Sequence, residues 1–236
     1  MAKKKSLPKD GDFEIKQLEK SIKLNRKHKL TEKQKRLLNI ILDKESKIIL
    51  INGPAGTSKT YIALYAALQE LLDNPDKTLI YLRSIVENTR RTIGLLPGSI
   101  EEKFSPYTLP LSDKMEEFLC VQDINYLLDS RIVQAMPINY LRGASWNNKI
   151  IILDEAQNVS TDEFITILTR IGENSKMIIC GDLMQSDIRY SGFKNICETF
   201  SCEDSKSMGI HQFSFDSSDI VRSAIVRFIV SKLEAA

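Results

Sequence analysis

Residues 48–60 read Ile48-Ile49-Leu50-Ile51-Asn52-Gly53-Pro54-Ala55-Gly56-Thr57-Ser58-Lys59-Thr60. A short apolar run, typical of a buried strand, leads into a loop of small residues that ends in Lys-Thr. The pattern nearly matches the phosphate-binding loop G-x-x-x-x-G-K-[ST], whose backbone N–H groups surround phosphates at the start of a helix. The stretch therefore predicts a strand, a phosphate loop and a helix, in that order.

Two residues of this loop have expected roles, and one residue departs from the pattern. We expect Lys59 to place its charge on the β- and γ-phosphates of a nucleotide, and Thr60 to offer its hydroxyl to Mg²⁺. Ser58 stands where the pattern has Gly, which is favoured there for its backbone freedom. Ser is small and keeps its N–H, so the loop can still close.

A second apolar run, at 149–153, ends in the two carboxylates Asp154 and Glu155. A phosphate-loop ATPase needs a second strand whose terminal Asp holds the metal, and a neighbouring Glu can orient or deprotonate the attacking water. Alone, such a run is usually a strand that ends in a solvated turn. The two elements together, in this order, favour the ATPase interpretation.

A third apolar run, at 177–180, leads into the polar residues 181–187. Ligands of open α/β sheets lie at the carboxyl ends of strands. We therefore expect Gln185 to reach the γ-phosphate and to report whether it is present. The alternative is a polar loop that makes no contact with nucleotide.

Composition limits the classes of function. The chain has 236 residues, enough for one large domain or two small ones, and 42% hydrophobic residues, enough for a core. The sequence has no apolar run of membrane-spanning length, and the basic residues 1–5 lack the apolar region of a secretory signal. The net charge of +2 indicates no partner, and the four cysteines show no CxxC pair. We expect a cytoplasmic protein with reduced thiols and no zinc site.

The order of predicted elements indicates the fold class. Residues 1–28 are polar and basic and are expected to be partly disordered, and 29–236 are expected to form one domain. Strands are predicted at 47–52, 78–82, 133–136, 150–153, 177–180 and 211–215. Helices are predicted at 31–42 with Thr31 as N-cap, from the phosphate loop to Asn74, and at 112–129, 162–171 and 216–232. This alternation predicts an α/β fold, with a mostly parallel sheet and helices on both faces.

These residues together resemble the PhoH family, ATPases related to the superfamily 1 helicases, from about residue 30 to the end. The family's loop reads Gly-Pro-Ala-Gly-Thr-Gly-Lys-Thr, which residues 53–60 match except at Ser58. The chain resembles the family's short form, which consists of the ATPase domain. The further matches are Leu96-Pro97-Gly98, Glu102-Lys103, Pro106-Tyr107, Arg142-Gly143, Asp154-Glu155-Ala156-Gln157-Asn158, Gly181-Asp182, Gln185, Asp187, Ser191-Gly192-Phe193 and Asp219-Ile220-Val221-Arg222.

The resemblance implies a RecA-like P-loop NTPase with ATP and Mg²⁺ as cofactors. It implies Thr60 and Asp154 as metal-binding residues, and Lys59, Glu155, Gln185 and Arg222 as catalytic residues. The implied phosphate cradle consists of Gly53, Pro54, Ala55, Gly56, Thr57 and Ser58.

The resemblance also implies roles for residues outside the loops. Gln34 would read adenine; an exposed helix glutamine is the equally weighted alternative. Arg222 would be an arginine finger in a neighbouring subunit's site, which requires a closed homo-oligomer, a hexameric ring being favoured. Its alternative is an ordinary surface arginine. Arg83 and Arg189 are lesser candidates for contacts with phosphate or nucleic acid.

The kinship with helicases suggests coupling to single-stranded RNA or DNA. Five residues could line such a groove, although aromatic residues more often lie in the core; they are Phe104, Tyr107, Trp146, Arg90 and Arg91. The chain has room for one RecA-like domain, so a monomer is not expected to unwind nucleic acid.

Two other classes of function stay open. One is a nucleotide-gated binding or assembly module with little turnover, which Ser58 favours and the trio Asp154, Glu155 and Gln185 opposes. The other is a small-molecule kinase, which is less favoured because the Asp-Glu-Ala-Gln strand end suits the activation of water.

Overall fold

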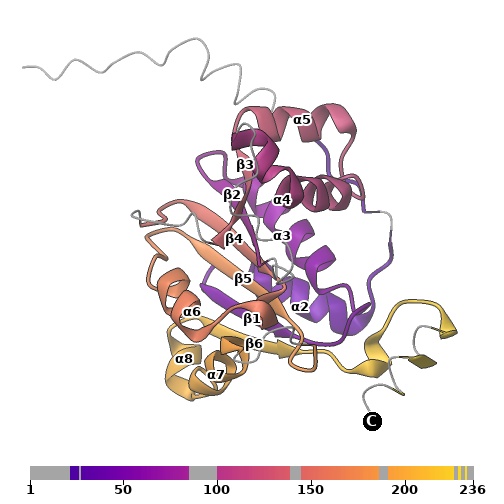
Figure 1. Cartoon of the computed structure of the whole chain (residues 1–236), viewed down its shortest axis with the longest axis vertical. Helices are drawn as coiled ribbons and strands as arrows, with labels where there is room; N and C mark the ends of the chain where they lie inside the picture. The colour runs from indigo at the N-terminus through magenta and orange to yellow at the C-terminus, as the bar shows by residue number, and fades with distance from the viewer. Residues whose placement is uncertain are drawn as a thin grey trace, which may run out of the picture.

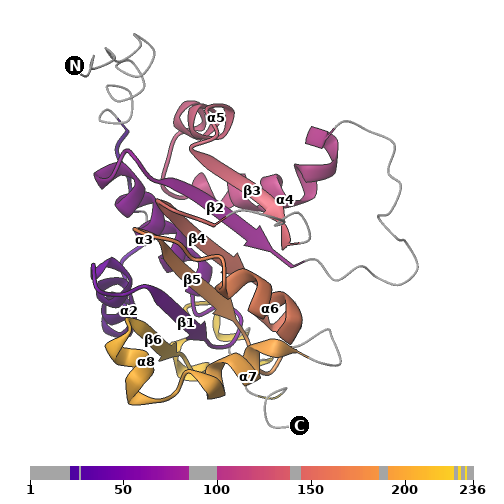
Figure 2. The same ribbon diagram turned by 90° about the vertical axis from the view of Figure 1, so that its left-hand side faces the viewer.

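The computed structural model describes residues 22–26, 28–84, 100–138, 145–185, 191–225, 228, 229 and 232. In the range 100–138, side chains are described from residue 107 onward. Its centre is a six-stranded sheet in the order β3-β2-β4-β5-β1-β6, in which every pair of neighbours is parallel (Figures 1 and 2). The strands are β1 (Ile48–Asn52), β2 (Thr78–Arg83), β3 (Val133–Pro137), β4 (Lys149–Asp154), β5 (Lys176–Gly181) and β6 (Ile210–Ser214).

Alternate side chains of the strands feed two separate cores, one on each face of the sheet. In β1, Ile49 and Ile51 belong to the first core, and Ile48 and Leu50 belong to the second. Successive side chains of a strand point to opposite faces, so a strand that is apolar at every position must be covered on both. The continuous apolar runs of the sequence are therefore explained by two layers of helices, one on each face of the sheet.

The helices form these two layers (Figure 1). The first core contains side chains from α2, α3, α4 and α5, and the second contains side chains from α6 and α7. The short helix α8 follows α7 and contacts β6. The helices are α2 (Glu32–Leu42), α3 (Lys59–Asp73), α4 (Ile100–Met115), α5 (Val121–Asp129), α6 (Thr161–Leu168), α7 (Gly192–Thr199) and α8 (Glu203–Ser207), with 3₁₀ turns η3 (Ala156–Asn158) and η4 (Ser217–Asp219).

The six predicted strands are confirmed, as is the helix capped by Thr31. The Thr31 hydroxyl accepts from the N–H of Gln34, and the Gln34 side chain accepts from the N–H of Thr31, which is a full capping box. Leu37, Leu38 and Ile41 then fall on the buried face of α2. The fold class is as predicted: an α/β, RecA-like P-loop architecture in which β5 lies between β1 and β4.

Two helix predictions were wrong, and two helices were not predicted. The stretch 112–129 is not one helix, because the chain turns at 116–120 to bury Phe118 against Tyr61 and Tyr65 before α5 begins. The stretch 216–232 does not start as an α-helix, because Asp216 caps the 3₁₀ turn η4 and residues 220–223 are not helical. Helices α7 and α8 were missed, being only eight and five residues long.

Part of the basic N-terminal segment packs on the domain. Ile22 is buried in the first core, and the N–H of Asn25 donates to the carbonyl of Phe118 at 2.9 Å. Residues 1–21 and 27 lie outside the described residues. Within the residues that are described, no helix is long and apolar enough to cross a membrane.

Candidate active site

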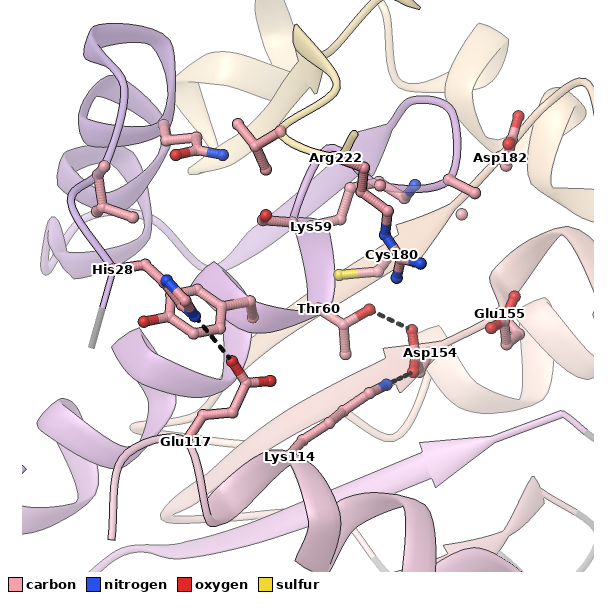
Figure 3. Close-up of a pocket in the computed structure, with 18 of the residues that line it drawn as sticks. His28, Lys59, Thr60, Lys114, Glu117, Asp154, Glu155, Cys180, Asp182 and Arg222 are labelled. Atoms are coloured by element: carbon pink, nitrogen blue, oxygen red, sulfur yellow. Dashed lines mark hydrogen bonds and ion pairs between the residues drawn. The ribbon is translucent and has the colours of Figure 1, made fainter. Parts of the chain in front are cut away.

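The predicted polar residues converge because the sheet is parallel. Strands β1, β4 and β5 end at the same edge, and a cavity of about 720 Å³ opens there (Figure 3). Insertion of β5 between β1 and β4 places the phosphate loop and the Asp-Glu pair on either side of the β5 end. The cavity is lined by His28, Lys29, Leu30, Gln34, Ala55, Gly56, Ser58, Lys59, Thr60, Tyr61, Lys114, Glu117, Asp154, Glu155, Gln157, Cys180, Gly181, Asp182, Gln185, Val221 and Arg222.

The phosphate loop needs glycine at two positions. A Cβ added to Gly53 would lie 2.7 Å from the Cβ of Phe215, closer than real side chains approach. Gly56 has a φ of +90°, and a Cβ there would lie 3.2 Å from the side chain of Arg222. The loop is therefore pressed against residues 215–222, and only glycine lets the backbones come this close.

Ser58 takes up the left-handed conformation for which glycine is favoured. Its φ and ψ are +68° and 27°, and its side chain makes no capping hydrogen bond to α3. A residue with a Cβ pays about 1–2 kcal/mol for this region. The departure from the family's loop therefore leaves the fold of the loop intact and carries a local strain.

Lys59 points along the loop. Its Nζ donates to the carbonyl of Pro54 at 3.0 Å and also to that of Gly53. Burial lowers the pKa of Lys59, against the opposing charges of Asp182, Asp154 and other neighbours. Among the described residues, the Lys59 ammonium is held by two loop carbonyls, and a phosphate anion could replace them as its partner. This is the role predicted for Lys59.

Thr60 and Asp154 join the two halves of the site. The Thr60 hydroxyl donates to Oδ1 of Asp154 at 2.7 Å, across 94 residues of sequence. A hydroxyl and a carboxylate oxygen are hard oxygen ligands of the kind Mg²⁺ prefers. In addition, the buried Oδ2 of Asp182 has no hydrogen-bond partner among the described residues. An acceptor of this kind suits the water ligands that Mg²⁺ keeps, so the residues fit a magnesium ion.

The other oxygen of Asp154 is held by two groups that the sequence analysis did not predict. Tyr81 donates its hydroxyl to Oδ2 at 2.5 Å, and Nζ of Lys114 lies 2.8 Å from the same oxygen. Burial alone would raise the pKa of Asp154, but the charge of Lys114 and these hydrogen bonds hold it below its usual range. Burial and the adjacent carboxylate raise the pKa of Tyr81, so its hydroxyl stays protonated as a donor.

Glu155 is fixed by its neighbour Gln157. The Gln157 amide donates to Glu155 at 2.8 Å and accepts from the N–H of Asp182 at 3.1 Å, which ties the β4 end to the β5 end. Glu155 has a left-handed φ of +55°, so its side chain leaves the strand at the cavity. Arg83 lies 3.7 Å from Glu155, which places Arg83 beside the site as one of the lesser candidates.

Gln34 and Gln185 both line the cavity, from different sides. Gln34 is 3% exposed, and its amide donates to the carbonyl of Thr57 at 3.3 Å. It is therefore not the exposed helix glutamine of the alternative, although reading of adenine stays a prediction. Gln185 is exposed in the loop that follows β5.

Arg222 lies in the cavity of its own chain. The N–H of Val221 donates to the carbonyl of Gly56 at 3.0 Å, and Arg222 extends from there toward Thr60 and Asp154 (Figure 3). We call residues 216–222 the strap. The action of Arg222 in a neighbouring subunit stays a prediction, and the strap brings it to the phosphate loop without one.

The expected nucleic-acid residues are only partly placed. Trp146 was wrongly considered for a groove: it is 7% exposed and packs in the second core, where it pairs with Ile171 in a β-bridge. Tyr107 is half-buried on α4. Arg90, Arg91, Arg189 and the side chain of Phe104 lie outside the described residues.

Among the described residues, neither the cysteines nor any other metal-ligating side chains form a second site. All four cysteines are free thiols, and burial raises the pKa of Cys180, beside Lys59, above its usual range. Over the described ranges, no three His, Cys, Asp or Glu side chains gather so as to hold a metal ion.

Comparison with known proteins identifies the family of the chain. The sequence model of the family described as "PhoH-like protein" matches residues 27–234. A PhoH-like protein of Bacillus subtilis is 35% identical over 190 residues, covering 79% of this chain and 58% of that protein. Protein PhoH of Escherichia coli K12 is 36% identical over 187 residues, covering 77% and 51%. The chain thus spans about half the length of these curated relatives.

Solved structures are more distant. A Pif1 from Bacteroides sp., crystallised in complex with ADP-AlF4, is 20% identical, with a TM-score of 0.39; the match covers 86% of this chain and 45% of that one. The family match and the P-loop fold support a nucleotide-binding protein of the NTPase type. With a family match over nearly all of its length and relatives above 30% identity, the chain belongs to the PhoH family.

Proposed function

We propose that the chain binds ATP with Mg²⁺ and hydrolyses it to ADP and phosphate. The observation that carries the proposal is the 2.7 Å contact between Thr60 and Asp154. This contact joins the phosphate loop to the acidic strand end, as the metal of a P-loop NTPase requires. Lys59 and Glu155 line the same cavity, on either side of it.

Each residue has a distinct task in the proposed reaction. Lys59 exchanges the carbonyls of Gly53 and Pro54 for phosphate oxygens and neutralises their charge. Glu155, oriented by Gln157, accepts a proton from water as the water oxygen bonds to the γ-phosphorus and the bond to the ADP oxygen breaks. Mg²⁺, held by Thr60 and Asp154, would stabilise charge on the β- and γ-phosphate oxygens. Gln185 contacts the γ-phosphate from the β5 side.

Steady-state phosphate release with Mg²⁺ and ATP tests the proposal. Glu155→Gln is expected to lower turnover by about 10²–10⁴-fold while ATP still binds, because it removes the base and keeps the shape. Lys59→Ala should lose both binding and turnover. Wild-type turnover in Glu155→Gln would contradict the assigned role of Glu155.

We extend the proposal to Arg222 acting in cis. Its place in the cavity of its own chain supports a contact with phosphate that needs no partner. The hexameric ring remains a separate proposal, and sedimentation velocity with and without nucleotide tests it. Turnover per subunit that does not change with protein concentration is the result expected of the cis arrangement.

Coupling to single-stranded RNA or DNA is the remaining part of the proposal. The family's kinship with helicases supports it, and the measurement is phosphate release with and without each polymer. Faster phosphate release with one polymer would identify that polymer as the preferred partner. Equal rates with and without each polymer would contradict coupling.

A nucleotide-gated module with little turnover is the second candidate, and the strained Ser58 favours it. A loop strained at Ser58 can bind nucleotide without reaching the geometry that the transition state requires. ATP binding without phosphate release, together with release restored in Ser58→Gly, would support this candidate.

A further inference from the structure

The cavity contains a cation that the proposed reaction does not use. Lys114, in the last turn of α4, places its Nζ 2.8 Å from Oδ2 of Asp154. The Asp154 side chain is only 4% exposed, so little water screens the pair. The ammonium is further fixed by the Tyr81 hydroxyl at 3.3 Å. Lys114 therefore supplies a full countercharge to the carboxylate that would hold Mg²⁺.

The two oxygens of Asp154 are divided between two kinds of partner. Oδ1 accepts from Thr60, and Oδ2 faces Lys114 (Figure 3). Oδ2 also accepts from the hydroxyl of Tyr81. A divalent cation that approaches from the Thr60 side meets a carboxylate whose charge is already balanced, with an ammonium across the same carboxyl group. In a poorly solvated site, such like-charge repulsion is strong.

We propose that Lys114 makes metal binding at Asp154 depend on the nucleotide. Its charge opposes a divalent ion that arrives alone, while the phosphates of ATP bring enough negative charge to accept both cations. Lys114 has room to move, because its side chain is 30% exposed and lines the cavity. The inference rests on the proposed magnesium site of Thr60 and Asp154, and it makes Lys114 a positioning residue.

Titration of the nucleotide-free protein with Mn²⁺, followed by the electron paramagnetic resonance signal of the free ion, tests the proposal. Wild type should bind Mn²⁺ weakly, and Lys114→Gln should bind it at least about tenfold more tightly because the opposing charge is gone. Lys114→Arg should behave like wild type. Lys35→Gln is the matched control, because Lys35 is exposed and pairs with Glu32 on the same helix, away from Asp154.

A second readout separates this role from simple structural support. In EDTA, Lys114→Gln should melt at a lower temperature than wild type, because a buried carboxylate has lost its partner. Mn²⁺ should restore that loss in Lys114→Gln and leave wild type unchanged. Asp154→Asn combined with Lys114→Gln should remove the gained Mn²⁺ affinity, which places the ion at Asp154.

Two outcomes would overturn the proposal. One is tight Mn²⁺ binding by nucleotide-free wild type, and the other is equal Mn²⁺ affinity in wild type and Lys114→Gln. Neither depends on ATP turnover. An inactive protein that shows the Lys114 effect would thus contradict the proposed hydrolysis and leave this inference standing.

Discussion

At the scale of single residues, Ser58 shows how a substitution can leave a motif's shape intact and still cost energy. The left-handed turn is set by the loop around it, since Gly53 and Gly56 are closed against Phe215 and the strap. Ser58 must follow that path although its Cβ disfavours it. The strain lies directly before Lys59, where small shifts matter most to a phosphate.

Replacing Ser58 tests this strain. We expect Ser58→Gly to raise the free energy of unfolding by up to about 1 kcal/mol, since relief of the left-handed strain exceeds glycine's entropy cost. Ser58→Val should lower it by more than about 1 kcal/mol, because branching at Cβ makes the same backbone harder to adopt. Urea denaturation measures both, and a Ser58→Val protein as stable as wild type would show that the loop is not strained.

At the scale of elements, α2 and the strap hold each other over the phosphate loop. Lys33, in the first turn of α2, pairs with Asp216 at 2.9 Å and also with Asp219. Gln34, the next residue, donates to the loop itself. Hydrogen bonding to Ser218 and to Lys33 holds the pKa of Asp216 below its usual range, so Asp216 stays charged at neutral pH. We call the two ion pairs of Lys33, with Asp216 and Asp219, the clamp.

Opening of this clamp should be visible as proteolysis. Lys33→Met removes both ion pairs, and we expect trypsin to cleave after Arg222 several-fold faster than in wild type, because local opening limits the cleavage of ordered segments. Mass spectrometry identifies the cut. Lys35→Met is the control on the same helix, and unchanged cleavage in Lys33→Met would show that the strap is held by other contacts, such as Val221 to Gly56.

At the scale of the whole molecule, a buried ion triad lies at the amino ends of the strands. Glu70 of α3 pairs with Lys77 at 2.7 Å and with Lys176 at 2.8 Å, and Lys176 also donates to the carbonyl of Ile41. The triad thus ties α2, α3, β2 and β5 together. Burial raises the pKa of Glu70, but the two lysines outweigh it and lower the pKa below its usual range.

The triad predicts a dependence of stability on pH. Glu70→Gln should cost about 3 kcal/mol at neutral pH, since it leaves two buried lysines short of a partner. A lowered carboxyl pKa contributes fully above the ordinary value of 4.5 and is lost as the pH falls through the folded value. The difference between wild type and Glu70→Gln should therefore shrink below that pH. Denaturation at several pH values measures it, with the exposed-pair variant Glu32→Gln expected to differ by less than about 0.5 kcal/mol.

The sequence predicted those parts of the molecule that rest on local pattern. Apolar runs gave six strands, and the loop, the Asp-Glu pair and Gln185 were placed at one edge because parallel strands share their carboxyl ends. Lys114 and Tyr81 escaped because they lie on a helix and a strand with no motif and meet Asp154 only in three dimensions. The position of the strap was not predicted, because its contact with Gly56 joins residues that are 165 positions apart in the sequence. The burial of Trp146 could not be decided from the sequence, because a single aromatic residue does not show whether it lies in the core or on the surface.

The hydrogen bond between Val221 and Gly56 couples the strap directly to the phosphate loop. If ATP binding shifts the carbonyls of the loop, Val221 must move with them or lose this hydrogen bond. The exposed apolar side chains of Ile225, Phe228 and Ile229 follow shortly after Val221 in the chain. A change at a bound phosphate would then alter the apolar surface that the molecule exposes in the segment after the strap.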